Sequence, residues 1–171
     1  MTQQKLFLCG FSGAGKTTFG DKLSKSSQFQ VFDLDDEIFN RMGSGYDHLS
    51  EYIEEIGIEE FRKDELDMLK LLDQNFKDNY LIILGGGALE TPEVAEFINS
   101  VDGKLIYLEA TFDECWQRIK KQGGRPLAKK GEAFMSQLFE SRLPLYRKAQ
   151  VLLTQENASA VDTIEDLVPF L

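Results

Sequence analysis

Five short apolar runs recur along the chain, and polar residues dominate the longer stretches between them. The runs lie within Leu6–Cys9, Val31-Phe32, Tyr80–Leu84, Lys104–Leu108 and Val151–Leu153. Near-continuous apolar runs without polar alternation are typical of strands that are buried on both faces. The pattern therefore predicts parallel strands in a sheet that is covered by helices.

The stretches between these runs carry helix start signals. Thr91-Pro92 places a capping residue before a proline at the first helical position, and Thr111–Glu114 has the pattern of a capping box. A long helical insert, broken near Gly57, is expected at about 49–76, and a polar, glycine-rich insert at about 122–132. The alternation predicts an α/β fold with two excursions.

Length, charge and cysteine content limit the class of protein. The 171 residues allow a single domain over 1–171. The formal net charge of −10 argues against general binding to nucleic acid or to an anionic membrane, because both require a basic surface. Two cysteines predict no disulfide framework, and no apolar run is long enough to span a membrane. We therefore expect a cytoplasmic, monomeric protein without nucleic-acid or membrane partners.

The segment Gly10–Thr17 matches the phosphate-binding pattern G-x-x-x-x-G-K-[ST] between a predicted strand and a predicted helix. Glycines let successive backbone N–H groups point at a polyphosphate, and the helix N-terminus adds the positive end of its dipole. Lys16 brings a positive charge to the outer phosphates, and Thr17 offers a hydroxyl to Mg²⁺. The motif predicts binding of a nucleoside triphosphate, which we expect to be ATP; the alternative is an ordinary glycine turn.

Two further features follow predicted strand ends, where ligands bind in open parallel sheets. Asp33 and Asp35 are expected to share one side of an extended segment, where one serves Mg²⁺ through water and the other accepts a proton from a substrate hydroxyl. The triplet Gly85-Gly86-Gly87 indicates a close approach of the backbone to a ligand. The alternatives are a solvated acidic loop and a tight turn.

Several arginines lie where an anionic substrate would need them. Arg62 is followed three residues later by Glu65, which can hold it in place on one helical face. Arg125 lies in the glycine-flanked polar segment, which has the character of a closing lid. Arg142 precedes a Leu-Pro-Leu-Tyr segment. The alternative for each arginine, taken alone, is a solvated side chain.

Taken together, in order and in spacing, these motifs resemble the shikimate kinase family over nearly the whole chain. The matching pieces are Gly13-Ala14-Gly15-Lys16-Thr17-Thr18, Asp33-x-Asp35, Phe61-Arg62-x-x-Glu65, Gly85-Gly86-Gly87, Arg118, Arg125-Pro126-Leu127 and Arg142-x-Pro144-Leu145-Tyr146. The resemblance implies a P-loop kinase fold like that of nucleoside monophosphate kinases, a three-layer sandwich whose five-stranded parallel sheet has the order 2-3-1-4-5. The substrate-binding insert would lie at about 34–62 and the lid at about 122–132.

The resemblance also implies an activity, the ATP-dependent phosphorylation of the 3-hydroxyl of shikimate, and roles for individual residues. ATP would be bound by Gly13, Ala14, Gly15, Lys16, Thr17, Thr18, Arg118 and Arg125, and Mg²⁺ by Thr17 and, through water, Asp33. Shikimate would be bound by Asp35, Arg62, Gly85, Gly86, Gly87 and Arg142, with the two arginines on its carboxylate. The catalytic groups would be Lys16, Asp35 as proton acceptor, and Arg125, which would swing in with the lid.

Some positions depart from the family pattern. Ile58 stands where an acidic residue is usual, Ala128 replaces the second leucine of the lid signature, and Gln155–Ala158 lacks the expected adenine loop. A kinase of another small hydroxylated carboxylate, such as gluconate, is therefore a second hypothesis. A nucleotide-binding regulatory module without turnover is a third, which the presence of all three expected catalytic residues disfavours.

Overall fold

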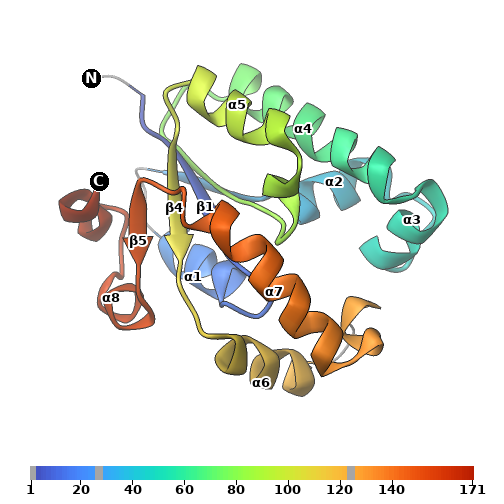
Figure 1. The fold of residues 1–171 in the computed structure, drawn as a ribbon. Coiled ribbons are helices and arrows are strands. Elements are labelled where there is room, and N and C mark those ends of the chain that lie inside the picture. Colours follow the sequence, from blue (N-terminus) through green and yellow to red (C-terminus); the bar gives the residue numbers. More distant parts are fainter. Residues whose placement is uncertain (1–2, 26–28, 123–125) are drawn as a thin grey trace.

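The computed structural model describes residues 3–25, 29–122 and 126–171. Within these residues, five strands form one sheet in the order β2-β3-β1-β4-β5, and every pair is parallel. Figure 1 shows β4 between β1 and β5. The strands are β1 (Lys5–Cys9), β2 (Gln30–Asp33), β3 (Tyr80–Ile83), β4 (Lys104–Leu108) and β5 (Val151–Leu153). The predicted fold class and strand order are confirmed.

Helices connect the successive strands. They are α1 (Lys16–Leu23), α2 (Leu34–Met42), α3 (Leu49–Ile56), α4 (Ile58–Asn75), α5 (Pro92–Ser100), α6 (Phe112–Gln122), α7 (Glu132–Tyr146) and α8 (Gln155–Ala160). Short 3₁₀ turns are η1 (Ala88–Glu90), η2 (Pro126–Lys130) and η3 (Glu165–Phe170). The excursion between β2 and β3 thus contains three helices, α2, α3 and α4, and it breaks at Gly57 as expected.

The predicted helix start at Thr111 has the reciprocal bonds of a capping box. The backbone N–H of Glu114 donates to Thr111 Oγ1 at 3.2 Å, and the backbone N–H of Thr111 donates to Glu114 Oε2 at 2.7 Å. These bonds satisfy N–H groups that would otherwise lack partners at the start of a helix. They fix where α6 begins, and α6 in turn packs against the loop after β1, as described below.

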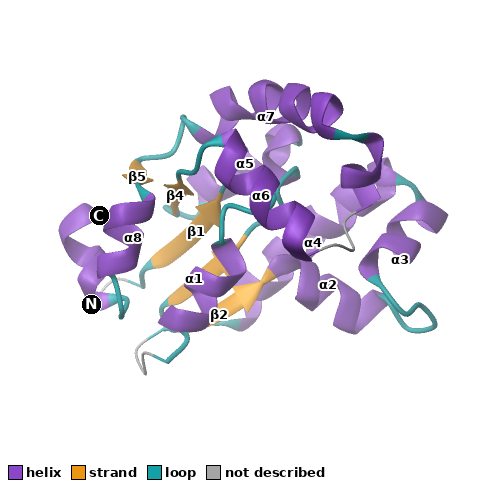
Figure 2. Ribbon diagram, turned by 90° about the horizontal axis from the view of Figure 1, so that it is seen from below, coloured by secondary structure: helices purple, strands orange, loops and turns teal. Residues whose placement is uncertain are grey.

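Figure 2 shows the sheet with the helices around it, and apolar side chains fill the space on both sides of the sheet. On one side, Phe7, Ile82 and Tyr107 pack in a cluster with side chains of α4, α5, α6 and α7. On the other side, Leu8 and Ile106 pack with side chains of α1, α8 and the C-terminal segment. Because both faces are covered, each strand is apolar at successive positions, which explains the uninterrupted runs in the sequence.

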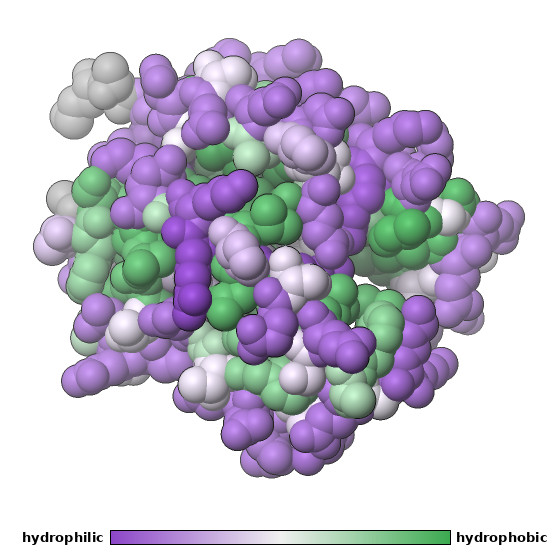
Figure 3. Space-filling model, viewed as in Figure 1, coloured by the Kyte–Doolittle hydropathy of each residue, from purple (hydrophilic) through white to green (hydrophobic). Residues whose placement is uncertain are grey.

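Hydrophilic residues make up most of the face shown in Figure 3, with hydrophobic residues gathered in patches between them. Within the described ranges, no helix combines the length and apolar character needed to cross a membrane. The parallel arrangement brings the carboxyl ends of all five strands to one edge of the sheet, and the loops that follow β1, β2 and β3 meet there.

Candidate active site

The loop between β1 and α1 wraps tightly because its glycines take conformations that other residues avoid. Gly13 and Gly15 have φ values of +82° and +96°. A Cβ at Gly13 would lie 2.6 Å from the carbonyl oxygen of Cys115, so α6 packs directly against the loop. Lys16 Nζ donates to the carbonyl oxygens of Gly10 and Phe11, at 2.8 and 3.1 Å. The loop therefore places its lysine at the carboxyl edge of the sheet.

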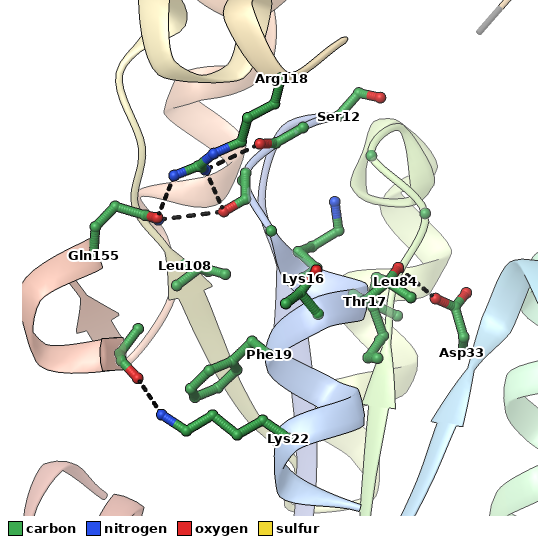
Figure 4. Close-up of a pocket in the computed structure, with 18 of the residues that line it drawn as sticks. Ser12, Lys16, Thr17, Phe19, Lys22, Asp33, Leu84, Leu108, Arg118 and Gln155 are labelled. Atoms are coloured by element: carbon green, nitrogen blue, oxygen red, sulfur yellow. Dashed lines mark hydrogen bonds between the residues drawn. The ribbon is translucent and has the colours of Figure 1, made fainter. Parts of the chain in front are cut away.

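A pocket of about 410 Å³ opens over this loop. Its lining includes the predicted nucleotide-binding run from Gly13 to Thr18 together with Asp33, Asp35, Gly85, Gly86 and Arg118. Figure 4 shows Lys16, Thr17 and Asp33 around this pocket, with Arg118 and Gln155 at one side. The structure thus brings together predicted site residues from the loops after β1 and β3 and from α1, β2, α2 and α6.

The two groups expected at a magnesium ion lie side by side. Thr17 Oγ1 donates to Asp33 Oδ2 at 3.0 Å, while Asp33 Oδ1 accepts from the backbone N–H of Asp35 at 3.2 Å and so caps α2 (Figure 4). Hydroxyl and carboxylate oxygens beside a phosphate loop suit Mg²⁺, which usually keeps several waters and takes few ligands from the protein. The pair therefore fits the ion through its donor chemistry.

Asp35 reaches the pocket by a different local structure from the one predicted. The sequence interpretation placed Asp33 and Asp35 on one side of an extended segment, but α2 begins at Leu34, so Asp35 lies in the first helical turn. Both carboxylates line the pocket even so, because the cap formed by Asp33 turns the chain there. The extended-spacing argument was wrong.

Two buried carboxyl groups meet the backbone at the first glycine of the triplet. A Cβ at Gly85 would lie 2.8 Å from Glu65 Oε1 and 2.9 Å from Asp35 Oδ1. Each of these oxygens is buried without a hydrogen-bond partner among the described residues. Burial, and then the negative charge of Asp33, raises the pKa of Asp35 to about 6. Burial likewise raises the pKa of Glu65 to about 7, although Arg62 opposes the shift.

The predicted arginine pair converges at the third glycine. Arg62 NH2 and Arg142 NH2 would lie 2.0 and 2.7 Å from a Cβ at Gly87, so a side chain at this position would displace both guanidinium groups. Arg62 NH1 donates to Glu65 Oε2 at 2.6 Å, which confirms the contact expected from their spacing. Arg142, on α7, is only 7% exposed. Two guanidinium groups in one place have the chemistry that suits a carboxylate.

Glu90 is a member of this cluster that the sequence analysis missed. Its carboxylate accepts from Arg142 Nε at 3.0 Å and from Arg142 NH2 at 2.9 Å, and it also accepts from Arg62 NH2 at 3.2 Å. It lies at the end of η1, and 28 and 52 residues separate it in sequence from its two partners. No local pattern signals a contact over such separations.

Arg118 and Gln155 form the side of the pocket opposite Asp33 (Figure 4). Arg118 NH1 donates to the carbonyl oxygens of Gly13 and Ala14, both at 3.1 Å, and its NH2 donates to Gln155 Oε1 at 3.0 Å (Figure 4). Gln155 Nε2 donates to Glu109 O at 2.7 Å. The segment Gln155–Ala158, expected only to lack a known adenine loop, is the start of α8 and contributes to the pocket wall.

The remaining predicted site residues are Gly86, Thr18 and Arg125. The carbonyl oxygen of Gly86 accepts a hydrogen bond from Tyr146 Oη, which ties the triplet to α7. Thr18 lies in the first turn of α1 and lines the pocket. Arg125 lies outside the described residues, as does part of the predicted lid, which is described only at Gln122 and from η2 onward.

Comparisons with known proteins agree with this geometry. A family model described as shikimate kinase matches residues 12–170. A shikimate kinase of Francisella philomiragia is 33% identical over 164 residues, which cover 94% of this chain and 90% of that protein. The solved structure of an Acinetobacter baumannii shikimate kinase in complex with shikimate superposes with a TM-score of 0.79 at 28% identity, covering 98% and 94% of the two chains. That of Aquifex aeolicus has a TM-score of 0.78 at 31% identity, covering 96% and 95%.

Proposed function

The chain belongs to the shikimate kinase family, and from this premise we propose that it transfers the γ-phosphoryl group of ATP to the 3-hydroxyl of shikimate. The products are shikimate 3-phosphate and ADP. The assignment to a kinase that uses ATP follows from the family itself. The roles of individual residues are our proposal, and they rest on the geometry of the pocket and of the glycine triplet.

The main support for this proposal is that the glycine triplet lies against a carboxylate at one end and against two arginines at the other. At Gly85 the backbone meets Asp35, and at Gly87 it meets Arg62 and Arg142. A substrate lying along the triplet would present a carboxylate to the arginines at one end and a hydroxyl to Asp35 at the other. Shikimate carries both groups on one small ring, so it suits a site of this length and chemistry.

Phosphoryl transfer requires mainly positioning and charge stabilisation. Asp35 would orient the acceptor hydroxyl and take its proton, and Lys16 would stabilise charge on the outer phosphates. Thr17 and, through water, Asp33 would hold Mg²⁺, which when bound neutralises phosphate charge. Thr18 and the loop backbone would contact the phosphates.

Arg118 has two tasks in this proposal. Its bonds to the carbonyl oxygens of Gly13 and Ala14 support the phosphate loop, and its flat guanidinium would lie against the adenine. Its bond to Gln155 connects this position with α8, so Gln155 becomes a candidate contact on the same side of the nucleotide. Arg125 is retained from the family resemblance as the lid residue that would neutralise charge on the transferring group.

A steady-state assay of ADP release tests the proposal. With ATP present, shikimate should stimulate ADP release, whereas gluconate and a control without acceptor should not. Arg142→Lys keeps the charge but loses the bidentate fork, so the KM for shikimate should rise about tenfold or more while the KM for ATP changes little. The matched control is Arg147→Lys, which changes an exposed arginine just beyond the end of α7.

Two results would count against the proposal. If shikimate failed to stimulate ADP release by the wild-type enzyme, the assigned reaction would be wrong. If Arg142→Lys and Arg147→Lys had the same KM for shikimate, the reaction would stand but the role of Arg142 would not.

A further inference from the structure

The carboxylate of Glu90 occupies the position between the two arginines that a substrate carboxylate would need. Each of its oxygens accepts from the Arg142 fork, and Oε2 also accepts from Arg62. Oε2 lies 2.7 Å from where a Cβ of Gly87 would be, and so against the same glycine as both guanidinium groups. A side-chain carboxylate of the protein thus makes the contacts through which arginine forks recognise a carboxylate.

Charge balance makes this arrangement significant for binding. Arg62 and Arg142 provide two positive charges at the triplet, and Glu65 and Glu90 provide two carboxyl groups in contact with them. Burial opposes ionisation of Glu90, but its bonds with Arg142 and Arg62 outweigh burial and lower the pKa of this carboxyl. Glu90 is therefore ionised at neutral pH, and an incoming carboxylate would have to compete with it for the same two arginines.

Of the two glutamates, Glu90 is the one that can leave. The Glu65 side chain is 0% exposed, on the inner face of α4, whereas the Glu90 side chain is 37% exposed at the end of a short 3₁₀ turn. Rotation of the Glu90 side chain would carry its charge into water with little change in its own solvation, because the group is already partly solvated. The bonds that Arg142 and Arg62 lose in this rotation would be replaced by bonds to the substrate carboxylate. Moving Glu65 would require α4 to repack.

We propose that Glu90 is an internal competitor for the substrate carboxylate and thereby a specificity-determining residue. It pairs with Arg62 and Arg142 when the acceptor site is empty, and the substrate carboxylate displaces it. The inference rests on the proposed function, because it requires an acceptor that carries a carboxylate. A polyol without a carboxylate cannot replace the bonds that Glu90 makes, so Glu90 discriminates against neutral acceptors. The same competition lowers the affinity for an acceptor that does carry a carboxylate.

A competitor and a purely structural Glu90 predict opposite effects of removing this side chain. Removing a competitor strengthens shikimate binding. If Glu90 stayed in place and oriented the two arginines while the substrate was bound, its removal would loosen them and weaken binding. The sign of the change in shikimate affinity therefore separates a competitor from a positioning residue.

The test measures shikimate binding and kinetics in Glu90→Gln and Glu90→Ala. Glu90→Gln removes the charge, and Glu90→Ala removes the competing group altogether. We expect the KM for shikimate to fall by about three- to tenfold in Glu90→Gln, and at least as far in Glu90→Ala, since a partly exposed charged pair contributes modestly. The effect should fall on KM rather than on kcat. The dissociation constant of shikimate, measured by calorimetry without nucleotide, should fall in parallel.

Glu93→Gln is the matched control, because it makes the same change of charge at an exposed glutamate in the first turn of α5, three residues away. It should leave the KM for shikimate unchanged, which excludes a general effect of net charge. An unchanged or raised KM in both Glu90 variants, with an active wild-type enzyme, would overturn the inference alone. A wild-type enzyme that shikimate does not stimulate would overturn the proposed function as well.

Discussion

Asp35 and Glu65 each bury a carboxyl oxygen that lacks a hydrogen-bond partner among the described residues, and both oxygens lie close to Gly85. An unpaired buried polar group costs stability, so its presence requires an explanation. For Asp35, which lines the pocket over the phosphate loop, we propose that a ligand hydroxyl completes its hydrogen bonding. Under this proposal, the cost in stability would prepare Asp35 as a proton acceptor.

The raised pKa of Asp35 predicts how activity depends on pH. With a pKa of about 6, Asp35 is protonated below this value and cannot accept a proton. The kcat/KM for shikimate should therefore rise with pH through about 6 and level off above it. Asp35→Asn should lower kcat by at least about a hundredfold. A variant that retained wild-type activity would contradict the role of proton acceptor.

The same pKa predicts an effect on stability. Because the pKa of Asp35 in the folded protein lies above its ordinary value of 3.8, the folded state holds the proton more tightly than the unfolded state does. This residue therefore makes the free energy of unfolding fall as pH rises from about 4 to about 6. Asp35→Asn should be more stable than the wild type by about 1–3 kcal/mol at pH 8, and the difference should vanish near pH 4. Urea unfolding of both proteins at the two pH values measures it.

At the scale of elements, the turn after β3 shows how a backbone segment shapes the site. Gly87 has φ −107°, which any residue can adopt, so its importance is not conformational. What it provides is space, because the two guanidinium groups approach the position that a side chain would fill. The three glycines bring Asp35 and Glu65 to one end of the segment and the arginines to the other.

Gly87→Ala tests this use of space. A methyl group would lie 2.0 Å from Arg62 NH2 and 2.7 Å from Arg142 NH2, so both side chains would have to move. We expect the KM for shikimate to rise about tenfold or more, because the bidentate geometry is lost. The KM for ATP should change by less than about twofold, since the phosphate loop is untouched. A shikimate KM close to that of the wild type would show that the arginines tolerate a methyl group.

Local sequence patterns predicted the elements whose signals are continuous along the chain. The phosphate loop is one such motif, and the buried strands and the capping box at Thr111 depend on neighbouring residues. Patterns of this kind failed where distant segments decide the structure. The role of Glu90 depends on contacts with α4 and α7, which no sequence window contains. The start of α2 at Leu34 is a different kind of miss, because its signal is local: Asp33 caps the helix through the backbone N–H of Asp35, and the sequence interpretation took this segment as extended.

At the scale of the whole molecule, the formal net charge of −10 coexists with cationic groups at the carboxyl edge of the sheet. Lys16, Lys22 and Arg118 line the pocket, and Arg62 and Arg142 meet beside the glycine triplet. The overall charge therefore disfavours diffuse binding of polyanions, whereas the local groups suit small anionic ligands. The parallel sheet makes this possible, because it brings loops from distant parts of the chain to one edge.

Because both cysteines are buried, the rates at which they are alkylated report how often the core of the protein opens. Neither is in a disulfide; Cys9 and Cys115 are 1% and 0% exposed, and burial raises the pKa of the Cys9 thiol to about 12. A thiol alkylates as thiolate and only when reagent reaches it. Iodoacetamide should therefore label the native protein at least about 10³-fold more slowly than the unfolded chain, because labelling requires an opening of the core.

The two sites should respond differently to nucleotide. Cys115 lies under the phosphate loop, where its carbonyl oxygen meets Gly13, so an occupied loop should slow the release of α6 and with it the alkylation of Cys115. Mass spectrometry of tryptic peptides, with and without ADP, measures both rates in one sample. If the cysteines of the native protein were alkylated as fast as those of the chain unfolded in guanidinium, their burial in the core would be contradicted. If ADP slows the alkylation of Cys115 more than that of Cys9, the two thiols report local unfolding around the bound nucleotide.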